Sequence, residues 1–63
     1  MRLTKQEQQM IEGIDPWYED GAVVSYTVYL NKGYIFNGED GSCFCEDTMQ
    51  EVKETLKTVT RAA

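Results

Sequence analysis

The chain has 63 residues, of which 11 are acidic and 6 are basic, so its net charge at pH 7 is −5. This length allows one domain, residues 1–63, with a small hydrophobic core. A hydrophobic content of 41% excludes a disordered chain, and the acidic excess argues against direct binding to nucleic acid. No apolar run approaches the roughly 20 residues that span a bilayer, and the N-terminus shows no secretory signal, so we expect a cytoplasmic protein without membrane contact.

The acidic excess itself has two explanations. A net charge of this size keeps a small domain in solution. It also suits a partner with a basic surface, such as a protein that itself binds nucleic acid. The composition is compatible with both.

An N-terminal helix is predicted over residues 4–12. Thr4, followed three residues later by Glu7, is the pattern of a capping box at its start. Gly13 and Pro16 are expected to end it. Its apolar face is formed by Met10, Ile11 and Ile14.

The stretch DPWYEDG, residues 15–21, is predicted to be a connection that holds two aromatic side chains among three carboxylates. In one interpretation Trp17 folds back and closes one end of the small core. In the other, Trp17 and Tyr18 form an exposed hot spot for a partner; an intermediate arrangement buries Trp17 and exposes Tyr18. The carboxylates that would pair with basic groups of that partner are Asp15, Glu19 and Asp20.

Three strands are predicted next, over residues 22–31, 34–37 and 42–46, separated by turns at 31–33 and 37–41. Turns this short join antiparallel neighbours, so we expect a three-stranded meander.

In the expected register Val28 lies opposite Phe36, and Cys43 and Cys45 fall on the core face. A slip of one residue would exchange the two faces. The residues expected on the opposite face are Tyr29, Ile35 and Phe44.

A C-terminal helix is predicted over residues 48–60, with Thr48 and Glu51 as a second capping box. The fold class is therefore α+β: a three-stranded antiparallel meander flanked by an N-terminal and a C-terminal helix, in the order α-β-β-β-α. The apolar face of the second helix is formed by Met49, Val52, Leu56 and Val59.

No catalytic residue, cofactor or metal site is predicted. The chain has no histidine, and its adjacent carboxylates lie at turns or helix starts, where acidic residues serve solvation and capping. Cys43 and Cys45 are interpreted as small buried hydrophobes, because two same-face thiols lack disulfide geometry and leave a zinc site incomplete unless a second copy adds two more. The acidic turn at 37–41 lacks the twelve-residue pattern of a calcium loop.

The sheet face that the C-terminal helix leaves bare needs a cover, because it carries apolar residues. The N-terminal helix is one candidate, and a homodimer or partner interface is the other. At one end of the meander, the acidic loops beside the strands are expected to converge. This predicted acidic end comprises Asp15, Glu19, Asp20, Glu39 and Asp40.

In size, acidity and order of elements the chain resembles the small acidic proteins that phages and plasmids use against host defences, the anti-CRISPR type among them. The resemblance implies an inhibitor that occupies a basic or nucleic-acid-binding surface of a larger protein, with carboxylates where phosphates would be. The predicted partner-binding residues are Asp15, Trp17, Tyr18, Glu19, Asp20, Tyr29, Ile35, Glu39, Asp40 and Phe44.

Two other functions compete with the inhibitor. A homodimeric structural or regulatory subunit would use the bare sheet face as its own interface. A small enzyme or metal carrier would use Cys43 and Cys45, and that hypothesis requires both thiols to react with an alkylating agent in the folded protein.

Overall fold

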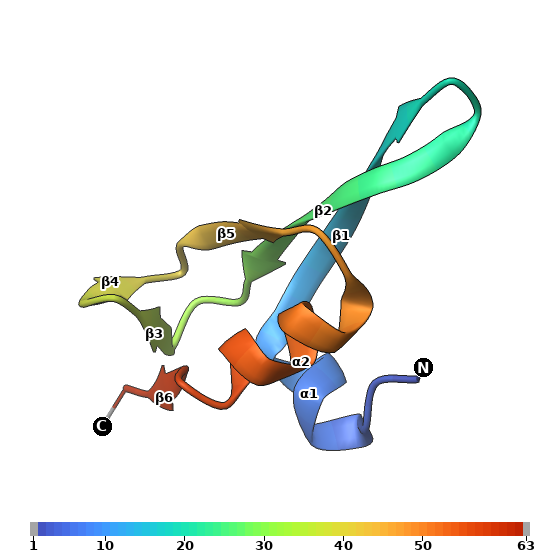
Figure 1. The fold of residues 1–63 in the computed structure, drawn as a ribbon. Coiled ribbons are helices and arrows are strands. Elements are labelled where there is room, and N and C mark those ends of the chain that lie inside the picture. Colours follow the sequence, from blue (N-terminus) through green and yellow to red (C-terminus); the bar gives the residue numbers. More distant parts are fainter. Residues whose placement is uncertain (1, 63) are drawn as a thin grey trace.

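Two small antiparallel sheets and two helices make up the described part of the chain (Figure 1). The structure is a computed structural model that describes residues 2–62, so the ends of the predicted domain, residues 1 and 63, lie outside the described part. The α+β class with antiparallel strands is confirmed. The single three-stranded meander is wrong, because the strands form two sheets, in the orders β1-β2-β5 and β4-β3-β6. In chain order the elements are α1 (Lys5–Met10), β1 (Ile11–Glu19), β2 (Ala22–Leu30), β3 (Tyr34–Phe36), β4 (Glu39–Asp40), β5 (Cys43–Glu46), α2 (Met49–Leu56) and β6 (Thr60–Arg61).

Strand β1 occupies residues that were expected to be a helix end and a connection. Helix α1 does end early, at Met10, but the chain continues as an extended strand. Pro16 lies opposite Tyr26 in β1, which is an edge strand. A backbone N–H at this position would point away from β2, so the absence of an N–H in proline costs no hydrogen bond of the sheet. The outer edge of β1 is thereby interrupted in the middle, which opposes the addition of another strand.

A two-residue turn, Asp20–Gly21, joins β1 to β2 between the paired residues Glu19 and Ala22. Both turn residues have positive φ, 51° and 80°. A type I′ turn requires this conformation, and Asp-Gly is one of the dipeptides that adopts it most readily. The turn fixes the register of a hairpin with two nine-residue strands, where the sequence predicts a connection.

A β-bulge bends this hairpin near its outer end. The pairing steps from Trp17–Ser25 to Tyr18–Val23, which leaves Val24 as an extra residue on β2. A bulge increases the local twist of the ribbon. Figure 1 shows the outer end of the hairpin projecting away from both helices, and the molecule measures 42 × 21 × 16 Å along its principal axes.

The predicted hairpin between strands 22–31 and 34–37 is wrong. Strand β2 pairs with β1 and β5, whereas β3 pairs with β4 and β6. The dipeptide Asn37–Gly38 has φ of 52° and 80° and folds β3 back onto β4. The edge of β2 that the predicted hairpin would have used is taken by β5.

The side chains of β5 point to the faces opposite to those expected. Val28 lies opposite Phe44, and Thr27 lies opposite Cys45. Phe44 is only 7% exposed and belongs to the core, whereas Cys43 and Cys45 are exposed. The faces differ from the expectation because β5 pairs with β2 and not with the strand at 34–37, and the larger apolar area of the phenylalanine ring favours the observed arrangement.

The hydrophobic core lies between one face of the β1-β2-β5 sheet and the two helices, with a contribution from the second sheet. The rings of Phe36 and Phe44 are 5.3 Å apart between centroids and tilted by 41°, which is within the range of favourable aromatic contacts. The buried residues of the core are Val28, Leu30, Phe44, Val52 and Leu56.

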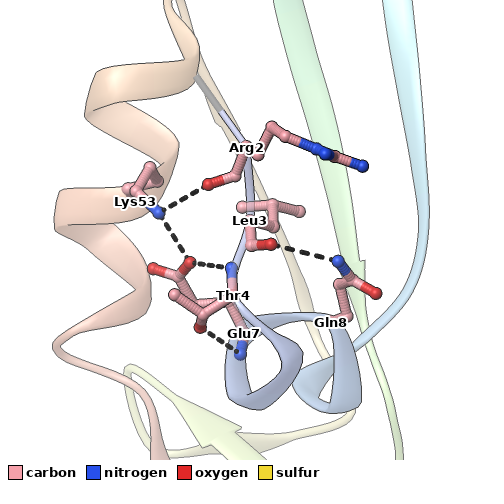
Figure 2. Close-up of polar contacts among 6 residues, drawn as sticks. All are labelled: Arg2, Leu3, Thr4, Glu7, Gln8 and Lys53. Carbon is pink, nitrogen blue, oxygen red and sulfur yellow. Dashed lines mark hydrogen bonds and ion pairs between the residues drawn. The ribbon is translucent and has the colours of Figure 1, made fainter.

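Helix α1 is held beside α2 by one lysine (Figure 2). Lys53 Nζ lies 2.7 Å from Glu7 Oε1 and donates to the carbonyl oxygen of Arg2 at 3.0 Å. The predicted capping box is confirmed, because Glu7 Oε1 also accepts from the backbone N–H of Thr4 at 2.7 Å and Thr4 Oγ1 accepts from Glu7 N–H at 3.1 Å. One carboxylate therefore caps α1 and attaches it to α2.

This attachment places α1 on the side of the sheet that α2 already covers. The expectation that the N-terminal helix covers the second sheet face is wrong for this reason. Within residues 2–62 no element packs on that face, which we call the open face. The residues that were expected to cover it pack against the core instead, namely Met10, Ile11 and Ile14.

Helix α2 begins where the sequence predicts and ends four residues earlier. Thr48 Oγ1 accepts from the N–H of Glu51 at 3.1 Å, so this half of the second predicted capping box is confirmed. The reciprocal half is wrong, because the Glu51 carboxylate accepts from the Thr48 hydroxyl at 3.0 Å and not from its backbone N–H. The run Thr58 to Thr60 consists of β-branched residues, which lose side-chain freedom in a helix, and Thr60 instead joins β6. No helix within residues 2–62 is long and apolar enough to cross a membrane.

Truncation of the core should destabilise the fold strongly. We expect Leu56→Ala to lower the free energy of unfolding by about 2–5 kcal/mol, because Leu56 is only 2% exposed and its loss leaves a cavity. Urea denaturation followed by circular dichroism measures this change. The exposed Gln50 on the same helix is the matched control, and Gln50→Ala should change stability by less than about 0.5 kcal/mol. Equal effects of the two variants would contradict the described core.

The ion pair between the helices should make stability depend on pH in acid. The hydrogen bonds from Lys53 and from the backbone of Thr4 hold the pKa of Glu7 below its ordinary value of 4.5. The unfolded chain therefore takes up this proton at a higher pH than the folded chain, so the stabilisation is complete above 4.5 and is lost as the pH falls below it.

Denaturation of wild type and Glu7→Gln between about pH 7 and pH 3 tests this dependence. The stability difference should be about 0.5–1 kcal/mol at neutral pH and shrink in acid. Glu54→Gln, at an exposed position of α2, should show no such trend. A difference for Glu7→Gln that stays constant across the range would contradict the assigned ion pair.

Candidate functional site

The outer half of the β1–β2 hairpin, residues 15–24, is the most exposed continuous part of the described chain, and we call it the arm. All ten of its residues are exposed. Trp17 is 58% exposed and Tyr18 is 66% exposed, so the predictions that Trp17 closes the core or is buried beside an exposed Tyr18 are wrong. Val23 and Val24 are exposed beside them. Single exposed hydrophobic residues are ordinary, but here large aromatic side chains are exposed on both sides of one ribbon.

The negative charge of the protein is concentrated in the same hairpin. Residues 11–30 contain four acidic and no basic residues, so the hairpin carries a charge of −4. The rest of the chain holds seven acidic and six basic residues and carries −1. Nearly all of the net charge of −5 therefore lies in the element that projects furthest from the core.

The two sides of the arm differ in chemistry. Alternation along β1 places Asp15, Trp17 and Glu19 on the side continuous with the open face. Pro16 and Tyr18 lie on the other side, which is uncharged. An acidic residue thus flanks the indole on each side along the strand, at a spacing of about 6.6 Å.

A buried hydroxyl at the base of the arm fixes the tryptophan. Trp17 Nε1 donates to Thr27 Oγ1 at 2.7 Å, and Thr27 is only 7% exposed. The same oxygen lies 3.3 Å from Cys45 Sγ. Because an indole N–H can only donate, Thr27 accepts from Trp17, and its own proton remains free for the sulfur. The indole is therefore fixed in orientation while more than half of its surface is exposed.

Tyr29 lies on the open face beside the same threonine. It is 40% exposed and pairs across the strands with Gly13 and Cys43. Desolvation and the neighbouring charge of Asp15 raise the pKa of Tyr29 above its ordinary value of 10.0. The phenol is therefore neutral at physiological pH. We call Asp15, Trp17, Thr27 and Tyr29 the Thr27 cluster.

Six of the predicted partner-binding residues are brought together by this hairpin. Three belong to the Thr27 cluster, and three lie near the tip of the arm. The six are Asp15, Trp17 and Tyr29 in the cluster, and Tyr18, Glu19 and Asp20 near the tip.

The other four predicted residues lie elsewhere. Phe44 is in the core, so its assignment to an exposed surface is wrong. Ile35 is half-buried in β3, where it pairs with Asp40. Glu39 and Asp40 form β4, which Figure 1 places at the opposite side of the molecule from the tip of the arm. The single acidic end is therefore wrong, because β3 leaves the first sheet and takes its acidic turn with it.

Two of the three adjacent carboxylate pairs contribute to the fold. Asp40 Oδ1 accepts from the backbone N–H of Gly33 at 2.7 Å. Glu46 Oε2 accepts from the hydroxyl of Thr55. The pair Glu19–Asp20 has no such contact and lies at the tip of the arm. It is thus the pair whose carboxylates remain available to a partner.

Sequence reasoning missed the role of Thr27 and the exposure of Val23 and Val24. The signal for the hairpin was present, since Asp20–Gly21 between two β-rich stretches is a strong hairpin pattern. No local signal indicates that Thr27 is buried beneath Trp17, because this contact depends on the cross-strand register.

The two thiols lie on the open face, and the prediction that they are buried is wrong. Cys43 and Cys45 are both exposed and alternate along β5. Among residues 2–62 no group of three or more Cys, His, Asp or Glu residues is placed to hold a metal ion. The enzyme or metal-carrier hypothesis requires both thiols to be accessible to an alkylating agent. Their exposure is compatible with this requirement, and alkylation tests it.

Two shallow hollows lie away from the arm. One of about 260 Å³ is lined by side chains of α1, β3 and β6. Another, of about 300 Å³, lies between α1 and α2. Both are open; Tyr34 and Arg61 line the first beside glutamine and methionine, and Glu7 and Lys57 line the second.

Comparisons with protein-family models, with curated proteins and with solved structures find no match. The function is therefore argued from the arm and the Thr27 cluster alone.

The open face makes a direct prediction about the thiols. We expect iodoacetamide to alkylate both Cys43 and Cys45 in the folded protein, because both are exposed. Mass spectrometry of the intact folded protein should show two alkyl groups added in the same time that the denatured protein needs. Protection of either thiol would show that the open face is covered in solution.

Proposed function

We propose that this chain is a small acidic protein-binding module that inhibits a larger protein by occupying its basic or nucleic-acid-binding surface, in the manner of the anti-CRISPR type of phage and plasmid proteins. The arm is the binding element, and the protein acts in the cytoplasm without a cofactor or a catalytic step. The observation that carries the proposal is the coincidence, in one projecting hairpin, of the exposed tryptophan and nearly all of the net charge.

The shape and side chains of the arm support this role. A projecting two-stranded ribbon can enter a groove that the body of the protein cannot. Trp17 and Tyr18 are the side chains most often found at interface hot spots. The hydrogen bond from Trp17 to Thr27 lowers the cost of ordering the indole on binding, because its orientation is already set.

The charge of the arm supports a basic partner. Four carboxylates without a neighbouring lysine or arginine attract a positive surface and accelerate association with it. The same charge repels nucleic acid, so we propose competition with nucleic acid for the partner and no direct binding to it.

A second candidate is a homodimeric structural or regulatory subunit. The open face favours it, because an uncovered sheet face with exposed Tyr29 is a natural site for a second copy. Light scattering over a range of concentrations separates the two candidates. A dimer mass at micromolar concentration supports the subunit, and a monomer mass supports the inhibitor.

Charge reversal on the hairpin should abolish capture of the partner. Tagged wild-type protein is used to capture partners from bacterial lysate, which are identified by mass spectrometry at low and high salt. We expect a single basic or nucleic-acid-handling protein, released as salt rises. Glu12→Lys combined with Glu19→Lys should weaken its capture at least about tenfold, because both charges lie on the hairpin.

The matched control is Glu39→Lys combined with Glu54→Lys. It changes the net charge by the same amount at two exposed positions outside the hairpin, so capture should persist. The captured protein is then tested for binding to nucleic acid with and without this chain. Equal loss of capture in both double variants, or undiminished binding to nucleic acid in the complex, would contradict the proposed inhibitor.

A further inference from the structure

We infer that the Thr27 cluster is a receptor for one arginine side chain of the partner, whose guanidinium stacks on Trp17 between Asp15 and Glu19. The inference rests on the proposed function and specifies the chemistry that the arm recognises. The arginine would bind the side of the arm that is continuous with the open face, and neither the tip nor the uncharged side.

The indole presents a bare aromatic surface. Its one polar group, Nε1–H, is already donated to Thr27 Oγ1 at 2.7 Å. What remains exposed, 58% of the residue, is aromatic surface without an unpaired donor. Such a surface attracts a cation by its quadrupole, and tryptophan does so more strongly than the other aromatic side chains.

Carboxylates stand on both sides of that surface. Asp15 and Glu19 are two residues before and two residues after Trp17, on the same side of β1. Each lies about 6.6 Å along the strand from the tryptophan, within reach of the edges of a guanidinium stacked on the ring. Stacking and carboxylate pairing therefore act on the same ligand.

The carboxylate of Asp15 is open to a ligand. Asp15 is exposed and lies on the same face of the hairpin as Tyr29 of the neighbouring strand. An ionised carboxylate accepts up to about four hydrogen bonds, so Asp15 retains the capacity for a bidentate contact with arginine. Within the described residues no lysine or arginine of the hairpin competes for it, because residues 11–30 contain none.

This arrangement favours arginine over lysine. A guanidinium is planar, stacks on aromatic rings, pairs with carboxylates through two parallel hydrogen bonds and is weakly hydrated. An ammonium is a strongly hydrated point charge, so it stacks less well on the ring and pairs less well with two carboxylates at once than a guanidinium does. A second copy of the chain is a poorer occupant, because two hairpins of charge −4 repel each other.

The experiment uses the full chain and its own fluorescence. Trp17 is the only tryptophan, so its emission reports on this site directly. We titrate the protein with an oligo-arginine peptide and with an oligo-lysine peptide of the same length and charge, at several salt concentrations. We expect the arginine peptide to change the emission and to bind about fivefold more tightly than the lysine peptide.

Variants assign the preference to the cluster. Asp15→Asn should reduce binding of the arginine peptide about threefold or more, and Glu39→Gln, which removes one charge outside the hairpin, should not. Thr27→Val removes the acceptor of the Trp17 hydrogen bond and should reduce the preference for arginine, while Thr27→Ser, which keeps the hydroxyl, should retain it. Circular dichroism verifies that each variant is folded.

Equal affinity for the two peptides, or binding without a change in Trp17 emission, would overturn the arginine receptor. A change of emission on concentrating the protein alone would assign the open face to a second copy and also overturn it. These failures are distinct from failure of the proposed function, because partner capture by the hairpin charges can persist when the two peptides bind equally.

Discussion

Strand β2 has to satisfy two opposite demands, and the rest of the structure depends on how it does so. Its second half is the centre of a three-stranded sheet and buries Val28 and Leu30 completely or almost so. Its first half has only β1 beside it and stands in water. The well-packed half supplies the energy that keeps the exposed half in register, because a two-stranded ribbon alone is marginally stable at best.

This division separates the core from the exposed arm. The core is built from β2, β5 and the helices, and the Glu7–Lys53 pair attaches α1 to it. The arm adds almost nothing to that core, and most of the net charge lies in its hairpin. Thr27 is the point where the two parts meet, since it is buried in the sheet and holds an exposed indole. Exposed residues of the arm can therefore be substituted with little effect on the core.

Local signals in the sequence predicted the local structure well. Thr4 and Thr48 cap the helices as their patterns indicate, and the β-branched stretch 22–30 is a strand. Which strands pair was not predictable in the same way, because it depends on the sum of distant contacts. The two glycine turns at 20–21 and 37–38 each close a local hairpin, and the second edges of β2 and β3 are taken by β5 and β6, so β2 and β3 do not pair. With β2 as the partner of β5, Phe44 lies on the core face and the two thiols on the other.

The position of Pro16 has a consequence for the behaviour of the protein at high concentration. An exposed, aromatic-rich ribbon with a free edge would ordinarily act as a template on which further chains add as strands and grow into fibrils. Pro16 removes one outward donor from the middle of that edge, and the neighbouring carboxylates repel an approaching copy. Pro16, which the sequence predicts as a helix stop, thus lies in a strand and opposes the addition of further strands to the exposed ribbon.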